Sequence, residues 1–100
     1  MFVEVTGGQV AVRDAANLKG LAVHAVDRTQ LAALGDLGTV DEGGDHVWLS
    51  IAALRDAAAA TVSADERAAW LDAYDGMIAY ATSKGWTSAD GTAVRAHITP

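Results

Sequence analysis

The chain has 100 residues, a length that suits one domain with one hydrophobic core, since typical domains run to about 100–150 residues. Hydrophobic residues make up 51% of the chain and charged residues 20%, which excludes a disordered chain. A net charge of -6, with the seven Lys and Arg residues scattered singly, argues against nucleic acid and anionic membrane surfaces as partners, and the absence of cysteine excludes disulfides, thiolate catalysis and cysteine metal sites.

The sequence also predicts where the protein works. The longest apolar run, Ile51 to Val62, contains Arg55 and Asp56 and is too short to span a bilayer. Met1 leads straight into strand-like sequence, without the charged and then apolar pattern of a targeting signal. We therefore expect a single α+β domain over residues 1–100, located in the cytoplasm.

The N-terminal residues predict a β-hairpin. Phe2–Thr6 and Gln9–Arg13 flank Gly7-Gly8, and two glycines allow the positive φ angles that a tight two-residue turn requires. In this register four valines share one face of the ribbon. The expected pairs are Thr6 with Gln9, Val5 with Val10 and Val3 with Val12.

The next segment predicts a strand and a short helix. Leu21–Val26 is apolar enough for a strand buried on both faces, and a short helix is the alternative for the same residues. Asp27 suits the N-cap of a brief helix over Arg28–Leu34, which Gly35 ends. Gly38 then begins another extended segment.

A second hairpin follows. Thr39–Glu42 and His46–Ser50 are strand-like and flank Gly43-Gly44-Asp45, which predicts a three-residue loop that contains glycine. Its polar residues could offer oxygen and nitrogen ligands to a cation, namely Asp41, Glu42, Asp45 and His46. Because the spacing of a calcium loop is absent, we interpret this segment as a solvated hairpin tip, and we expect no metal and no cofactor.

Two consecutive helices are predicted in the C-terminal half. Ser50 suits the N-cap of a helix over Ile51–Ala60. Ser63 and Glu66 form the pattern of a capping box at the start of a helix that runs to Lys84 and stops at Gly85. Apolar residues form one stripe on this second helix, namely Trp70, Leu71, Tyr74, Met77, Ile78 and Ala81.

The last element and the fold class follow. After a turn at Asp90-Gly91, Thr92–Thr99 alternates in polarity and predicts a strand, with Val94, Ala96 and Ile98 on one side. We expect an α+β fold in which a mainly antiparallel sheet of four to five strands carries the two consecutive helices on one face.

The candidate catalytic residues are the three histidines, His24, His46 and His97, which all fall in strand-like segments. They could converge on one sheet face and work with a carboxylate such as Glu4, Asp45 or Asp75. No local spacing typical of metal ligands or of an acid–base pair accompanies them, so three separate histidines are the simpler interpretation.

The candidate interface residues are Trp48 and Tyr80. Trp48 shares a strand face with His46 and Ser50, and Tyr80 lies off the main apolar stripe of its helix. The leading hypothesis is a small interaction or accessory protein, expected to be a homodimer or to bind another protein. The alternative is a small-molecule-binding protein or a small acid–base enzyme that uses a histidine and a carboxylate in a pocket lined by Trp48.

Overall fold

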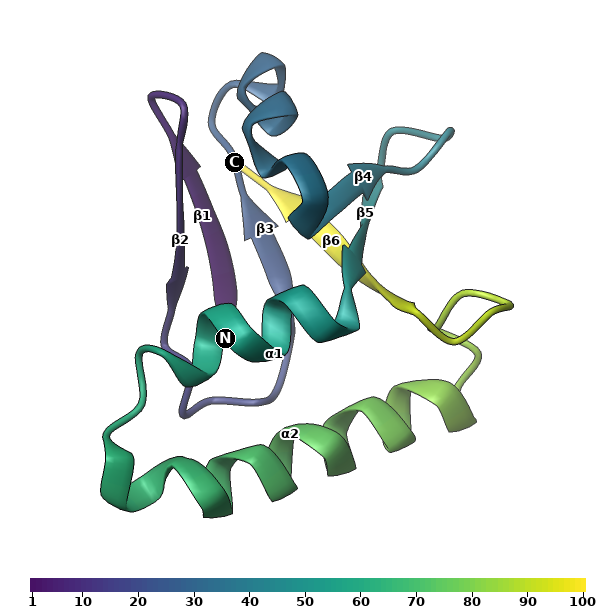
Figure 1. The fold of residues 1–100 in the computed structure, drawn as a ribbon. Helices are drawn as coiled ribbons and strands as arrows, with labels where there is room; N and C mark the ends of the chain where they lie inside the picture. Colours follow the sequence, from purple (N-terminus) through teal and green to yellow (C-terminus); the bar gives the residue numbers. More distant parts are fainter.

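The chain adopts an α+β fold in a computed structural model that describes all of residues 1–100 (Figure 1). The strands are β1 (Phe2–Thr6), β2 (Gln9–Arg13), β3 (Ala22–His24), β4 (Gly38–Val40), β5 (His46–Ser50) and β6 (Ala93–Thr99). The helical segments are the 3₁₀ helix η1 (Arg28–Leu37) and the α-helices α1 (Ile51–Ala59) and α2 (Ala64–Ser83). No helix is both long and apolar enough to cross a membrane.

The strands form one mixed sheet in the order β2-β1-β3-β6-β5-β4. Strand β3 runs parallel to both β1 and β6, and the other three pairs are antiparallel. The α+β class is therefore confirmed, but the sheet has six strands instead of four to five, and it is mixed instead of mainly antiparallel. The reason is that β2 ends beside the start of β1 and residues 14–21 stay at that end of the sheet, so β3 starts there and runs in the direction of β1.

The N-terminal hairpin has the predicted register. Thr6 lies opposite Gln9, Val5 opposite Val10 and Val3 opposite Val12. Gly7 and Gly8 have φ angles of 57° and 81°, which only glycine adopts without strain in two successive positions. The turn chemistry and the alternation of valines point to the same pairing, and this agreement made the register predictable.

Strand β3 is shorter and less buried than predicted. Val23 is fully buried, but Val26 is 91% exposed and lies beyond the end of the strand. Ala22 and His24, which point to the opposite face from Val23, are only half-buried. Burial on both faces was therefore a wrong prediction, because η1 and α1 lie over only one side of the sheet (Figure 1).

The segment after β3 is a 3₁₀ helix that continues past its predicted end. Asp27 is the N-cap, as predicted, and its carboxylate accepts the backbone N–H of Thr29 at 2.9 Å. Gly35, with φ 53°, breaks the helical geometry, but the segment resumes and reaches Leu37. The second hairpin also differs, because the N–H of Asp41 donates to the carbonyl of His46 at 2.8 Å, so its loop comprises the four residues 42–45.

The two α-helices lie close to their predicted positions. The Ser50 hydroxyl accepts the N–H of Ala53 at 3.2 Å, as an N-cap should. Ser63 precedes α2 but makes no side-chain capping bond, and the N–H of Glu66 donates to the Ser63 backbone carbonyl at 3.1 Å. The capping box was therefore a wrong prediction, since a backbone bond already satisfies that N–H.

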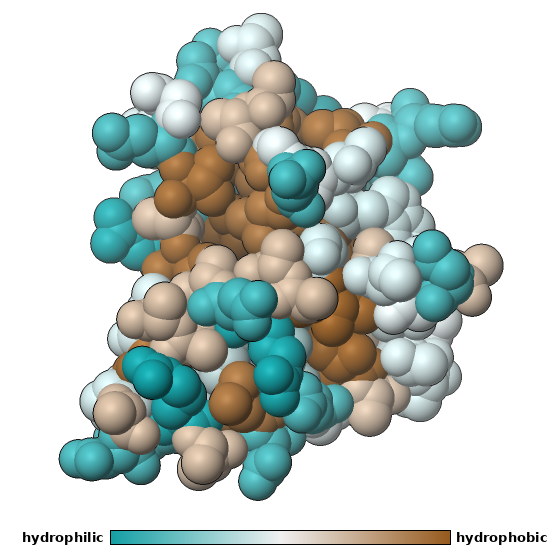
Figure 2. All heavy atoms as spheres, in the orientation of Figure 1, coloured by the Kyte–Doolittle hydropathy of each residue, from teal (hydrophilic) through white to brown (hydrophobic).

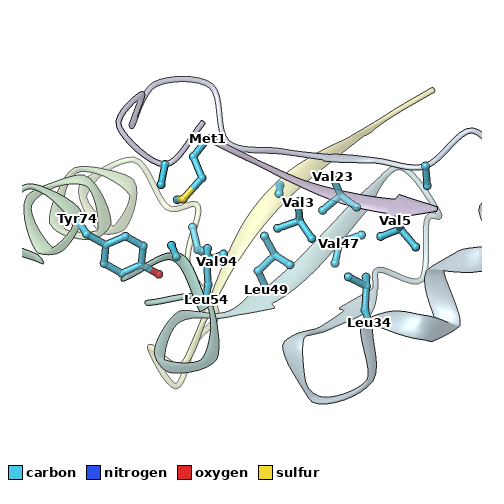
Figure 3. Packing of buried hydrophobic residues seen from close by; sticks show 14 of the residues in the cluster. Met1, Val3, Val5, Val23, Leu34, Val47, Leu49, Leu54, Tyr74 and Val94 are labelled. Atoms are coloured by element: carbon cyan, nitrogen blue, oxygen red, sulfur yellow. The ribbon is translucent and has the colours of Figure 1, made fainter. Parts of the chain in front are cut away.

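The core lies between the inner face of the sheet and the helices (Figure 3). Alternate residues of neighbouring strands supply it, among them Val3, Val23, Val47 and Leu49, all with exposures of 0%. Leu54 of α1 is equally buried. This regular alternation leaves every second residue of each strand on the outer face of the sheet.

Helix α2 does not lie on the sheet face as predicted. It packs against α1 and runs below the ends of the strands (Figure 1). The Trp70 indole N–H donates to the Ala15 carbonyl at 2.7 Å, and the Tyr74 hydroxyl donates to the Ile51 carbonyl at 2.9 Å. In Figure 2, hydrophobic residues remain visible between η1 and α1, while hydrophilic residues cover much of the region of α2. The C-terminal half of α2 thus projects beyond α1, and it forms one wall of a cleft.

Candidate functional site

The three histidines share the outer face of the sheet. His46 lies directly opposite His97 in the β5–β6 pair, and His97 lies opposite Ala22 in the β3–β6 pair. Since residues two apart on a strand point to the same side, His24 also lies on that face. The sheet therefore brings the three to one surface, but not to one point.

Two of the imidazoles form a pair. The ring centroids of His46 and His97 lie 4.8 Å apart, with the rings tilted by 41°. His24 instead contacts Phe2, with ring centroids 4.4 Å apart. The histidines thus belong to two clusters on neighbouring strands.

The carboxylates considered as partners of the histidines are engaged elsewhere. Glu4 pairs with Arg13 at 3.4 Å, and Asp75 pairs with Arg55 at 3.0 Å. Asp45 is exposed at the tip of the second hairpin. The outer face consequently offers no hydrogen-bonded imidazole–carboxylate pair of the kind that a general acid–base enzyme uses.

Trp48 lies on the same outer face but is tied to the hairpin. Its indole N–H donates to the Asp41 carboxylate at 3.0 Å. This hydrogen bond and one from the backbone N–H of Gly43 hold the pKa of the Asp41 carboxyl below its usual value. No group of three or more His, Asp or Glu side chains could hold a metal ion, so Asp41, Glu42, Asp45 and His46 do not gather as a ligand set.

A large open cleft lies where the C-terminal half of α2, residues 16–21 and the sheet meet. Its volume is about 1010 Å³, and nine of its fifteen lining residues are hydrophobic. Helix α2 provides Met77 and Tyr80, the 16–21 segment provides Leu18 and Leu21, and Trp86 follows the helix. Such dimensions and such a lining are typical of small-molecule sites.

The position of Trp86 follows from how α2 ends. Gly85 has φ 76°, and the N–H of Trp86 donates back to the Ala81 carbonyl at 2.9 Å while the N–H of Gly85 donates to Thr82 at 3.1 Å. These are the bonds of a Schellman motif. The N–H of Arg95 then donates to the Trp86 carbonyl at 2.8 Å. The aromatic residue is therefore held between the helix end and β6.

Tyr80 and Trp86 form an aromatic wall. Their ring centroids lie 5.9 Å apart in an edge-to-face arrangement, and the Lys84 ammonium lies 5.6 Å from the centre of the Tyr80 ring. Tyr80 is 56% exposed and Trp86 is 40% exposed. Much apolar aromatic surface is thus open to solvent beside the cleft, and a ligand could cover it.

The lining of this cleft contains basic side chains but no acidic ones. Lys19, Arg95, His46 and His97 line it, and the lining includes no Asp or Glu. The chain as a whole carries thirteen acidic residues and a net charge of -6. The cleft is therefore a local region of opposite character, with basic side chains from β5, β6 and the 16–21 segment and apolar side chains from α2.

Of the residues singled out from the sequence, the cleft contains His46, His97 and Tyr80, whereas His24, Trp48 and Asp41 lie outside it. Reasoning from the sequence missed Trp86 as a lining residue, together with Lys19 and Arg95. The helix stop at Gly85 was predicted from the sequence. Because Trp86 follows it directly, its position beside the end of the helix could have been inferred. Nothing local marked Lys19 or Arg95, because only the sheet order brings them together.

Comparison with known proteins gives no relative. No family model, no curated protein and no solved structure matches the chain.

Proposed function

We propose that the protein binds a small molecule in the cleft between α2 and β6. The single observation that carries this proposal is the cleft itself, about 1010 Å³ in volume with nine hydrophobic lining residues. The half-exposed rings of Tyr80 and Trp86 support it, because covering aromatic surface is a main source of affinity for apolar ligands.

Binding fits the site better than catalysis does. His46 and His97 face each other in the cleft, but the lining holds no carboxylate to orient either imidazole. An acid–base mechanism needs such a partner or an equivalent group within hydrogen-bond reach. Of the alternatives raised from the sequence, we therefore propose small-molecule binding. The tryptophan that lines the pocket is Trp86, whereas the sequence analysis expected Trp48.

The test combines native mass spectrometry of protein purified gently from its own source with a thermal-shift panel of small metabolites. Ala73 lines the cleft from α2, so Ala73→Phe should fill part of it and abolish the retained mass and the thermal shifts. Ala79→Phe is the matched control, because Ala79 is exposed on the same helix and does not line the cleft. No retained mass and no shift with any compound would contradict the proposal.

A second candidate function is contact with another protein through the outer sheet face. Neither η1 nor α1 covers this face (Figure 1), and it carries Phe2 and Trp48 besides the histidines and Arg95. Its basic groups favour contact with an acidic segment of a partner. A symmetric pair of identical faces is less favourable, because it would place Arg95 and the histidines near the same basic groups of the second copy.

Crosslinking in cell extract followed by mass spectrometry, with a photoreactive residue in place of Thr39, tests this second candidate. Thr39 is exposed and lies opposite Trp48 on the same face. An adduct with an acidic segment of another chain would support it. A homodimer adduct, the state expected from the sequence, would assign the face to a second copy instead, and absence of any adduct would count against an interface here.

A further inference from the structure

The ligand class can be inferred from how charge is distributed around the cleft, and this inference rests on the proposed binding function. Arg95 and His97 are two residues apart on β6 and point to the same side, where His46 lies opposite His97. Lys19 enters from the 16–21 segment. A cation beside these groups would meet basic side chains, because the lining of the cleft contains no Asp or Glu.

The side of the cleft that α2 forms is apolar. Met77, Tyr80 and Ala81 project from α2, and Trp86 extends this wall beyond the helix end. The carbonyls at the end of α2 carry partial negative charge, which disfavours an anion close to them. The backbone N–H groups of Gly85 and Trp86 already occupy the carbonyls of Thr82 and Ala81, so these two carbonyls offer little to a polar group of a ligand.

We propose that the cleft binds an organic anion with one apolar group, an organic acid in chemical class. Its anionic end lies at Arg95, Lys19 and the His46–His97 pair, and its apolar group lies against Tyr80 and Trp86. The arginine guanidinium can donate two parallel hydrogen bonds to a carboxylate or phosphate. The edge-to-face rings leave exposed aromatic surface for a planar or aliphatic group.

The net charge of the chain does not prevent this. Interactions between exposed charges are largely screened beyond about 8 Å at physiological ionic strength, so a small anion inside the cleft responds mainly to the side chains that line it. A long polyanion extends past the cleft and meets the acidic surface of the rest of the chain. The inference therefore concerns a small molecule and not a nucleic acid.

The experiment is isothermal titration of the full chain with three compounds that share one skeleton: indole-3-acetate, the neutral alcohol tryptophol and the amine tryptamine. We expect the carboxylate to bind about tenfold more tightly than the alcohol, a ratio that corresponds to about 1.4 kcal/mol. The amine should bind more weakly than the alcohol. Inorganic phosphate alone should bind too weakly to displace the carboxylate, because it lacks the apolar group.

Charge variants locate the anionic end. Arg95→Gln should weaken the carboxylate about tenfold and leave the alcohol unchanged. Arg13→Gln is the control, since it alters net charge equally on the same sheet face but lies on β2 and does not line this cleft. Equal effects of the two variants would overturn the assignment of the anionic end to Arg95.

The outcomes separate this inference from the function on which it rests. Binding of the alcohol or amine as tightly as the carboxylate overturns the ligand class while leaving small-molecule binding intact. If none of the three compounds binds, the class is also wrong, and the comparison of Ala73→Phe with Ala79→Phe over the broad panel decides the proposed function independently.

Discussion

The backbone N–H of Trp86 donates to the carbonyl of Ala81 at 2.9 Å, so the last turn of α2 and the aromatic wall of the cleft are built by one motif. The motif depends on Gly85, whose φ of 76° lies in the left-handed region. An open environment surrounds this glycine, with no atom within 4 Å of an added Cβ. Backbone conformation alone therefore decides the effect of a side chain at this position.

Gly85→Ala should lower the free energy of unfolding by about 1 kcal/mol, because an L-residue in the left-handed region costs about 1–2 kcal/mol. Gly76→Ala is the matched control. Gly76 lies within α2 with equally open surroundings, so there the change should stabilise the protein by about 0.5–1 kcal/mol. Urea denaturation of both variants measures the difference. Equal effects would mean that the motif does not hold the helix end.

Trp70 and Trp86 should separate stability from binding, because only Trp86 lines the cleft. Trp70 is 7% exposed, and its indole N–H donates to Ala15, so Trp70→Ala should cost about 3–5 kcal/mol. Trp86 is 40% exposed, so Trp86→Ala should cost only about 1 kcal/mol. The same Trp86 variant should weaken ligand binding about tenfold or more. Denaturant curves together with titration of the bound small molecule test the pair, and unchanged affinity in Trp86→Ala would remove Trp86 from the site.

The elements predicted well from the sequence are those whose signals are local. The Gly7-Gly8 turn and the alternating valines specify the same register, and Asp27 and Ser50 each cap the helix that follows them. In each case the residues that decide the structure lie within a few positions of each other. Consequently a hairpin or a cap can be read without knowing the rest of the fold.

The parts that were missed depend on contacts between distant residues. Strand β3 pairs in parallel with β1 and β6, and no local pattern specifies these two neighbours. The cleft has the same origin, since Lys19, Tyr80 and Arg95 come from a loop, a helix and a strand. From the sequence, convergence of the histidines was one possibility among others. The register of β5 against β6 decides whether His46 meets His97, and the sequence does not specify that register.

Tyr74 should make stability fall at high pH. Its ring is fully buried and its hydroxyl donates to the Ile51 carbonyl, and burial raises the pKa of the phenol. Because the folded-state pKa lies above that of the unfolded chain, the stabilisation is complete below pH 10 and is lost as the pH rises further. Tyr74→Phe should cost about 1 kcal/mol at pH 7 through the lost hydrogen bond, but it should flatten the decline between pH 10 and 11. Chemical denaturation at several pH values checks the slope, and an equal slope in both proteins would contradict the assignment.

Asp90 should make stability fall at low pH. It lies in the turn that leads from Trp86 into β6. Its carboxylate accepts the hydroxyls of Ser88 at 2.6 Å and Thr92 at 2.8 Å and the backbone N–H of Thr92 at 3.1 Å. These hydrogen bonds lower the pKa of Asp90 to about 2. A folded-state pKa below the unfolded value contributes stability above about pH 4 that is lost as the pH falls toward 2.

Asp90→Asn removes the carboxylate and should abolish that part of the acid dependence. The variant keeps one acceptor oxygen, so the turn should still form at pH 7 and the unfolding midpoint in urea should shift only slightly. Asp72 is a suitable control position, since it is exposed on α2 and makes no comparable turn. We expect the wild type and Asp72→Asn to lose stability in parallel between pH 4 and pH 2, and Asp90→Asn to lose less. Parallel loss in all three proteins would show that the acid sensitivity comes from carboxylates other than Asp90.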